Sequence, residues 1–368
     1  MTATLPLLYV GTYSEPIRFA SGTVREGNGR GIHVLRLNAA TGTIAEIAAP
    51  VRARNPSYLA FDGARRFVYA VNEMKQHDGR FGGTASAFAI DAATGNLTLL
   101  NTVATEGTDP CHLAVDRSGR NLLVANYSSG HVTVLPIRGD GSLGPATQII
   151  SHHGSSLDPI RQTGPHVHHV AIDDVGARVY TTDLGLDRIV VYRLDTARGR
   201  LVPDDPPFIE LPPGAGPRQM VLRPGGAHAY VLNELGSSVA IHTYNATSGR
   251  LLPERIVPTL PAGFTDKNFC AEMQIAPSGR FLYASNRGHD SIAIFAIEPD
   301  GDLASLGHVS TGGAAPRCFD LTPSGEFLAA ANQDSGNVVL FRVDIQTGVL
   351  TPTGSIAPVG TPVCVRFL

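Results

Sequence analysis

Two positions of an internal repeat hold side chains that could bind an anion and move protons. The planar guanidinium of arginine suits carboxylates and phosphates, while histidine and glutamate commonly carry protons in catalysis. Ion pairs at strand ends would explain single charged residues, but the recurrence of charge at equivalent positions favours a shared site. The first position holds Ser57, Cys111, His168, Arg218, Ala271, Arg317 and Val363, and the second holds Tyr13, Glu73, Tyr127, Leu184, Glu234, Arg287 and Gln333.

The repeat that carries these positions predicts β-structure. Each unit has an apolar segment, a tight turn and a second apolar segment ending in Asn or Asp, as in "GPRQMVLRPGGAHAYVLNE" (216–234). The terminal Asn or Asp falls at 72, 126, 183, 233, 286 and 332, with spacings of 54, 57, 50, 53 and 46 residues. This length accommodates one four-stranded propeller blade with its loops. Because the Asn recurs, we expect it to hydrogen-bond the adjoining backbone.

The two ends of the chain complete one further unit. The segment "PVCVRFL" (362–368) is typical of an inner strand that lacks a partner, and "LPLLYVGTYS" (5–14) is typical of a second strand. We therefore predict an all-β fold, a single seven-bladed β-propeller over residues 1–368, with four-stranded antiparallel blades. The N-terminal and C-terminal strands would share one blade and close the ring, which leaves only short, protected sheet edges.

The predicted blades place both chemistry-bearing positions on one face. In a four-stranded blade the start of the inner strand and the end of the second strand lie on the same side. The loops expected there are long (13–30, 73–84, 151–165 and 261–269), whereas turns on the opposite side, such as "PSGR", are short. Long ordered loops in a compact domain are usually functional. We expect one concave site at this mouth of the ring.

Composition excludes several classes of function. The chain is 43% hydrophobic and 17% charged with a net charge of −3, and no basic run indicates nucleic-acid binding. No run of about 18 apolar residues predicts a membrane span, and the N-terminus lacks a recognisable secretory signal. The four cysteines form no CxxC pair, so we expect reduced, buried thiols and a cytoplasmic protein; they are Cys111, Cys270, Cys318 and Cys364.

Histidines gather in one repeat unit, at 152, 153, 166, 168 and 169. In a strand His166 and His168 would share one side, with His169 on the other. Imidazole is a common metal ligand, so a metal site is an open alternative. Since no third ligand is fixed by spacing, we predict neither a metal nor a cofactor.

Several motifs resemble the 6-phosphogluconolactonase-like lactonases, a family that includes fungal carboxy-cis,cis-muconate lactonising enzymes. These motifs are "YVGTYS", "NPSYLAFD", "GPRQMVLRP", "YVLNEL" and "PSGRFLYASNRG". The site proposed in the muconate enzymes has a His, two Arg and a Glu at this mouth. The resemblance implies these roles for His168 in "VHHVAID", Arg218 in "GPRQM", Arg287 in "SNRG" and Glu234 in "LNEL". Because of "HVHHV", His166 is an alternative to His168.

The resemblance implies hydrolysis of a sugar lactone, with a small anionic or polyhydroxylated molecule as the partner. Glu234 would be the general base, Arg218 and Arg287 would stabilise the oxyanion, and His168 would protonate the leaving alkoxide. Glu234→Gln would then slow turnover without changing the melting temperature. The alternatives are a muconate-type lactonising enzyme and a non-catalytic binding propeller. Further substrate contacts are expected from Arg317, His166, Lys267, Glu73, Asp183 and Tyr127.

Overall fold

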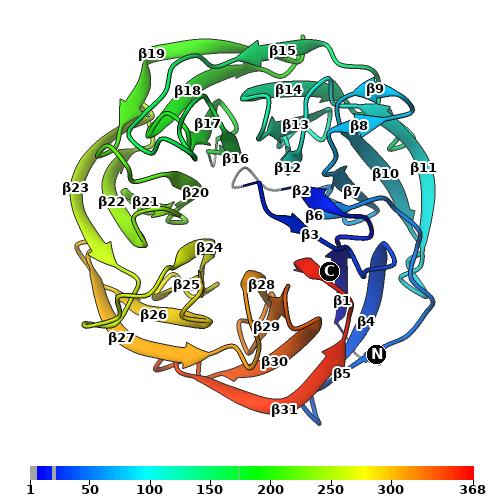
Figure 1. The fold of residues 1–368 in the computed structure, drawn as a ribbon, viewed down its shortest axis with the longest axis vertical. Coiled ribbons are helices and arrows are strands. Elements are labelled where there is room, and N and C mark those ends of the chain that lie inside the picture. The colour runs from blue at the N-terminus through cyan, green and yellow to red at the C-terminus, as the bar shows by residue number, and fades with distance from the viewer. Residues whose placement is uncertain (1–5, 19–21, 174) are drawn as a thin grey trace.

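The computed structural model describes residues 6–18, 22–173 and 175–368, and in it seven four-stranded antiparallel sheets form a ring (Figure 1). This arrangement confirms the predicted propeller. From the inner to the outer strand, the first three blades are β32 (Pro362–Phe367), β1 (Leu7–Thr12), β4 (Ile32–Asn38) and β5 (Thr43–Glu46); β6 (Pro56–Phe61), β7 (Phe67–Asn72), β10 (Thr84–Ile90) and β11 (Leu97–Ala104); and β12 (Pro110–Val115), β13 (Asn121–Asn126), β14 (His131–Pro136) and β15 (Gln148–Ser151).

The remaining four blades run in simple chain order from the axis outward. They are β16 (Val167–Ile172), β17 (Arg178–Asp183), β18 (Arg188–Asp195) and β19 (Arg200–Glu210); β20 (Pro217–Leu222), β21 (His228–Asn233), β22 (Ser238–Asn245) and β23 (Arg250–Pro258); β24 (Phe269–Ile275), β25 (Phe281–Arg287), β26 (Ser291–Ile297) and β27 (Leu303–Ser310); and β28 (Pro316–Leu321), β29 (Phe327–Asn332), β30 (Asn337–Val343) and β31 (Leu350–Pro358). Two short hairpins stand apart, β2 (Ile17–Arg18) with β3 (Val24–Arg25) and β8 (Gln76–His77) with β9 (Arg80–Phe81).

Both ends of the chain meet in one blade, as predicted. Strand β32 pairs antiparallel with β1, and Val365 lies opposite Val10. The Leu368 backbone N–H donates to the Leu7 carbonyl at 2.9 Å. The last strand therefore serves as the inner strand of the first blade and closes the ring.

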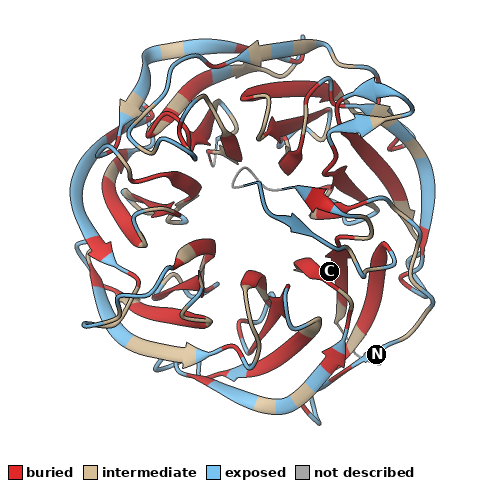
Figure 2. Cartoon of the chain, viewed as in Figure 1, coloured by how far each residue is buried: buried red, intermediate tan, exposed pale blue. Residues whose placement is uncertain are grey.

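Burial follows the position of a strand within its blade. All six residues of β13 are buried, because the middle strands are covered on both faces by neighbouring blades. The outer strand β11 is mostly exposed, and Figure 2 shows the same change from buried to exposed toward the rim. The apolar middle strands thus supply the contacts between blades. No helix of the described chain is long and apolar enough to cross a membrane.

A recurring tyrosine links neighbouring blades. In five blades a buried tyrosine of the second strand donates its hydroxyl to a glycine carbonyl in the outer turn of the next blade. Each of these glycines has positive φ, which glycine adopts without a steric penalty. The pairs are Tyr9–Gly95 (2.8 Å), Tyr69–Gly141 (3.1 Å), Tyr180–Gly249 (2.9 Å), Tyr230–Gly301 (2.8 Å) and Tyr283–Gly348 (2.9 Å).

The recurring asparagines at the end of the second strand hold the backbone, as predicted for most of them. The side-chain amide of Asn72 donates to the Arg54 carbonyl, and that of Asn286 donates to the Thr259 carbonyl, each at 2.8 Å. Asn332 donates to the Thr311 carbonyl at 3.0 Å and Asn126 to that of His131 at 3.3 Å. Asn233 instead donates to the Ser238 hydroxyl at 3.0 Å.

A β-bulge at the start of each inner strand places the first chemistry-bearing position. In six blades one inner-strand residue is left out of the pairing with the second strand, and in β24 two residues are left out opposite Ser285 of β25. A bulge changes the direction of the side chain it carries. The extra residues are Ser57, Cys111, His168, Arg218, Arg317 and Val363, with Ala271 and Glu272 in β24.

Candidate active site

A cavity of about 850 Å³ opens at one mouth of the ring, and long loops contribute to its wall. The β2–β3 hairpin extends over the centre of the ring (Figure 1) and supplies Arg18 and Arg25, while the loop after β15 supplies Arg161. The charged side chains in the lining are Arg18, Glu73, Arg25, Asp109, Asp158, Arg161, Glu234, Lys267, Arg287, Asp290, Arg317 and Asp334. The predicted concave site is therefore present on the long-loop face.

A backbone hydrogen bond fixes the second chemistry-bearing position in six blades. The N–H of the residue at this position donates to the carbonyl two residues before the bulge. The same local geometry therefore directs tyrosine in one blade and glutamate in another to the same mouth. The bonds join Tyr13 to Thr361 (3.0 Å), Glu73 to Asn55 (3.0 Å), Tyr127 to Asp109 (3.0 Å), Leu184 to His166 (2.9 Å), Glu234 to Gly216 (2.7 Å) and Gln333 to Ala315 (3.0 Å).

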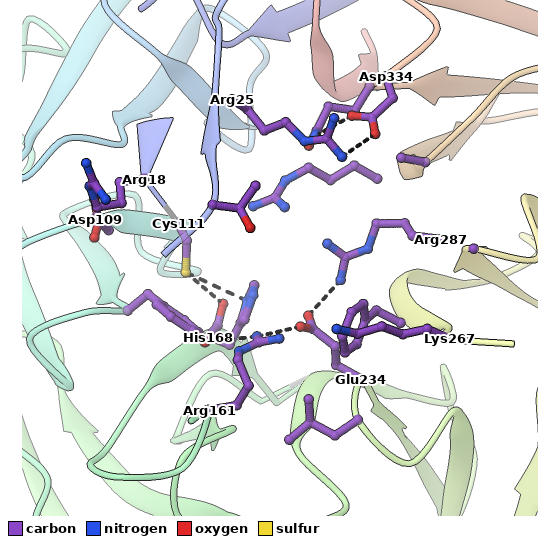
Figure 3. Close-up of a pocket in the computed structure, with 18 of the residues that line it drawn as sticks. Arg18, Arg25, Asp109, Cys111, Arg161, His168, Glu234, Lys267, Arg287 and Asp334 are labelled. Carbon is purple, nitrogen blue, oxygen red and sulfur yellow. Dashed lines mark hydrogen bonds and ion pairs between the residues drawn. The ribbon is translucent and has the colours of Figure 1, made fainter. Parts of the chain in front are cut away.

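Glu234 is the centre of a buried charge cluster. Arg161 Nη2 lies 2.7 Å from its Oε1, and Arg287 Nη2 lies 2.8 Å from its Oε2 (Figure 3). Arg218 Nε adds a longer contact of 3.6 Å to Oε2. One carboxylate thus holds three guanidinium groups from three different parts of the chain, and we call these four residues the arginine cluster. Arg161, Glu234 and Arg287 line the cavity, whereas Arg218, for which a direct contact with the oxyanion was predicted, is not part of the lining.

The arginine cluster determines the protonation state of Glu234. Burial alone would raise the pKa of this carboxyl, but Arg287, Arg161 and Arg218 outweigh burial and hold the pKa well below its usual range. A carboxylate with so low a pKa accepts a proton poorly. Its Oε1 already accepts a hydrogen bond from Arg161, and its Oε2 is ion-paired with Arg287. This environment argues against the general-base role predicted for Glu234. Burial lowers the pKa of Arg287 to about 10, so its guanidinium remains charged at neutral pH.

His168 lies next to the arginine cluster as a neutral imidazole. Arg218 Nη1 contacts both ring nitrogens, at 3.1 Å from Nδ1 and more closely at Nε2. Burial, followed by the Arg218 charge, lowers the pKa of His168 well below its usual range. This low pKa disfavours the imidazolium form that the predicted protonation of an alkoxide requires. Cys111 donates its thiol to the His168 carbonyl at 3.4 Å, and burial followed by the charge of Glu73 raises the pKa of that thiol.

Glu73 forms a second acidic centre in the same cavity. The Tyr13 hydroxyl donates to its Oε2 at 2.9 Å, while Arg317 Nη2 lies 3.9 Å from that oxygen. Arg317 also covers the Tyr13 ring, with its guanidinium carbon 5.5 Å from the ring centre. The cavity therefore contains two glutamates with very different cationic surroundings.

Two predicted substrate contacts lie outside the cavity lining. Asp183 is buried in the blade, where it contacts His152 Nδ1 at 2.7 Å and accepts the His166 backbone N–H at 2.7 Å. His166 stacks on Tyr127, with ring centres 4.4 Å apart. These two side chains position Tyr127, which does line the cavity together with Lys267. The structure thus assigns Asp183 and His166 supporting contacts and gives neither a place in the wall.

His169 and His152 each belong to a stacked or hydrogen-bonded pair, whereas His153 is exposed. His169 stacks on His112 at 3.9 Å between ring centres, and burial lowers the pKa of His169 to about 3. His152 contacts Asp183 and the Tyr192 hydroxyl, each at 2.7 Å. Within the described ranges, no group of three or more His, Cys, Asp or Glu side chains is arranged to hold a metal ion.

Arg161 is a site residue that was not predicted from the sequence. It contacts Glu234, and it donates to the Tyr127 hydroxyl at 3.0 Å. It lies in the loop 151–165, outside the repeated positions, so the repeat could not reveal it. The available signal was the length of that loop on the face of the site. An arginine in such a loop is a candidate for contact with the charges below it.

Comparison with known proteins identifies the class to which this fold and site belong. The family described as "Lactonase, 7-bladed beta-propeller" matches residues 7–367. A 6-phosphogluconolactonase from Bacillus subtilis is 36% identical over 361 residues, covering 98% of this chain and 97% of the relative. A 6-phosphogluconolactonase from Formosa agariphila is 31% identical over 328 residues, covering 88% of this chain and 91% of the relative.

A solved structure agrees over the whole chain. The periplasmic gluconolactonase of Pseudomonas aeruginosa superposes with a TM-score of 0.91 at 35% identity and covers 99% of each chain. The chain therefore belongs to the seven-bladed β-propeller lactonase family. The expected resemblance, fold and class of enzyme are confirmed, and a small-molecule lactone is the class of substrate that this family implies.

Proposed function

We propose that this protein hydrolyses a sugar lactone, of the 6-phosphogluconolactone or gluconolactone type, to the open-chain acid. The arginine cluster in the cavity is the observation that carries this proposal, because ester hydrolysis develops negative charge on the carbonyl oxygen and guanidinium groups stabilise that charge. The names of the B. subtilis and P. aeruginosa relatives support a sugar lactone as the substrate.

The arginine cluster is prepared for an oxyanion before the substrate arrives. Glu234 fixes the guanidinium groups and offsets part of their mutual repulsion, so little reorganisation is needed during the reaction. Within the described part of the chain, Arg287 Nε and Arg161 Nε are buried donors that lack a hydrogen-bond partner. An unsatisfied buried donor is costly, so a bound oxygen that accepts from it would be favoured.

The rim of the cavity supplies groups that suit the rest of a sugar lactone. Tyr127 and Ser128 offer hydroxyls to the polyol. Lys267 and Arg18 line the cavity, where Lys267 Nζ lies over the Phe269 ring and Arg18 Nη1 donates to the Gly22 carbonyl at 3.3 Å. Both are in position to contact a phosphate group on the substrate.

A lactone panel tests the proposal directly. Proton release on adding gluconolactone, 6-phosphogluconolactone and simple aliphatic lactones is followed in weak buffer, with subtraction of spontaneous hydrolysis. We expect turnover of a sugar lactone, and Arg287→Ala serves as the matched variant that lacks one oxyanion donor. If no lactone is hydrolysed faster than in buffer, while the acid products bind, the protein is a binding propeller and the proposal is wrong.

We also propose that the protein acts in the cytoplasm. Cys111, Cys270, Cys318 and Cys364 are all free and buried, as is common for proteins of reducing compartments. One relative of similar structure is named as periplasmic, so the periplasm is the alternative compartment that the experiment must exclude. Fractionation of cells that express the full-length protein tests the proposal. We expect the protein to co-fractionate with a cytoplasmic marker, and its release by osmotic shock would show that the proposal is wrong.

A further inference from the structure

The backbone of Glu73 is hydrogen-bonded through both its N–H and its carbonyl, and its side chain lines the same cavity as Glu234. It directly follows β7, its backbone N–H donates to the Asn55 carbonyl at 3.0 Å, and its own carbonyl accepts the Asn55 side-chain amide at 3.1 Å. Both glutamates occupy the second position of their blades, so the fold directs them to the same mouth. Because the backbone is fixed in this way and the Tyr13 hydroxyl holds the carboxylate, the side chain can meet a substrate in one defined orientation.

The groups that face Glu73 leave its charge only partly compensated. Tyr13 donates one hydrogen bond at 2.9 Å, and the nitrogen of Arg317 stays 3.9 Å away, beyond hydrogen-bond distance. The other titratable neighbours are Asp109, which carries the same charge, and the thiol of Cys111. Glu234, in contrast, forms two short ion pairs with guanidinium groups, at 2.7 Å from Arg161 and 2.8 Å from Arg287.

The two carboxyl groups therefore differ in basicity. Burial raises the pKa of Glu73, and Asp109 raises it further, while Arg317, Ser57 and Tyr13 oppose the rise without cancelling it. For Glu234 the surrounding arginines outweigh burial and lower the pKa. When one carboxyl group of a site has a raised pKa and another has a lowered pKa, the first is suited to proton transfer and the second to remaining charged.

We propose that Glu73 is the catalytic residue that takes a proton from the attacking water, while Glu234 is a positioning residue that holds the arginines around the carbonyl oxygen. The inference rests on the proposed lactone hydrolysis and reverses the roles expected from the resemblance. Its geometric basis is that both carboxylates line one cavity, with Arg317 acting on both of them.

The reaction balances with water as the only co-reactant. Water oxygen forms a bond to the lactone carbonyl carbon while one water proton passes to the Glu73 carboxylate, and the carbonyl electron pair moves onto the oxygen beside Arg287 and Arg161, which both line the cavity. The tetrahedral intermediate then collapses. The bond from carbon to the ring oxygen breaks, and Glu73 returns its proton to that oxygen, which gives the hydroxy acid and the original carboxylate.

The test compares Glu73→Gln with wild type on whichever sugar lactone the panel identifies. Glutamine keeps the size of the side chain and an acceptor for the Tyr13 hydroxyl but cannot take up a proton at neutral pH. We expect kcat to fall by about 10²–10⁴-fold, the usual effect of losing a general base, with KM changed far less. The wild-type pH profile of kcat/KM should fall on the acidic side, and this limb should disappear in Glu73→Gln.

Tyr13→Phe provides a second test, because a purely structural role of Glu73 would not change the pH profile in this variant. It removes a hydrogen bond that stabilises the ionised Glu73, so the pKa rises and the acidic limb should move to higher pH. If Glu73→Gln keeps more than about a tenth of wild-type kcat, or keeps the acidic limb, the inference is wrong although wild type remains a lactonase. If wild type hydrolyses no lactone, both the proposed function and the inference fail.

Discussion

Replacing Glu234 by glutamine tests the charge balance of the site, because the change removes one negative charge and little volume. The carboxylate faces guanidinium nitrogens at 2.7, 2.8 and 3.6 Å. The arginine side chains involved are only 17%, 17% and 8% exposed, so solvent does little to screen them. The variant would retain three buried or half-buried cations without their shared partner.

Breaking a buried ion pair by removing one partner costs about 3–5 kcal/mol, and we expect a loss of this size for Glu234→Gln. For a chain of 368 residues, this corresponds to a fall in melting temperature of about 4–6 °C. The expectation from sequence was a normal melting temperature, so the structure changes the predicted outcome. Turnover should fall as well, because the oxyanion donors lose their fixed geometry.

The effect of Glu234→Gln should depend on pH with a defined sign. The pKa of Glu234 is lowered in the folded protein, so its stabilisation is fully present above the ordinary carboxyl pKa of about 4.3 and disappears as pH falls through the folded value. The difference between wild type and variant should therefore be largest near neutral pH and shrink in acid. Thermal melts followed by circular dichroism from neutral pH to well below about pH 4.3, the unfolded carboxyl pKa, measure this difference.

Glu210→Gln is the matched control, because Glu210 also pairs with an arginine, at 3.2 Å from Arg188, but its side chain is 68% exposed. Loss of an exposed pair costs about 0–1 kcal/mol, so this variant should melt like wild type. If Glu234→Gln also melts like wild type at neutral pH, the three guanidinium groups do not depend on the carboxylate, and the argument for the arginine cluster fails.

Other features of the fold and site lead to further predictions. Deleting residues 362–368 removes β32 and opens the ring, so cooperative unfolding should be lost, and a sharp wild-type-like melt would contradict ring closure. Tyr69→Phe removes the hydroxyl bonded to Gly141 and should cost about 1 kcal/mol in denaturant titrations; an unchanged midpoint would show that the link between blades contributes nothing. Lys267→Ala should raise KM about twofold to fivefold for a phosphorylated lactone but not for an uncharged one, and equal effects on both would exclude a phosphate contact. Dialysis against EDTA should leave turnover unchanged, and loss of activity restored by a divalent metal would refute the metal-free mechanism.

Repetition in the sequence allowed most of the fold to be predicted. A four-stranded blade needs apolar strands and glycine turns at fixed offsets, so each unit could be recognised without knowledge of the others. The unpaired segment 362–368 also predicted ring closure, because an inner strand must pair with a second strand. The same repeat located the first chemistry-bearing position, which the structure shows to be a β-bulge in every blade.

Tertiary structure alone decided which charges meet and what they do to each other. Arg161 lies outside the repeat, and its contact with Glu234 depends on how its loop folds over the mouth. Glu73 and Glu234 occupy equivalent positions in the sequence, yet one has a raised and the other a lowered pKa. The physical reason is that local sequence fixes backbone geometry, whereas the electrostatic potential at a side chain sums charges brought from distant parts of the chain.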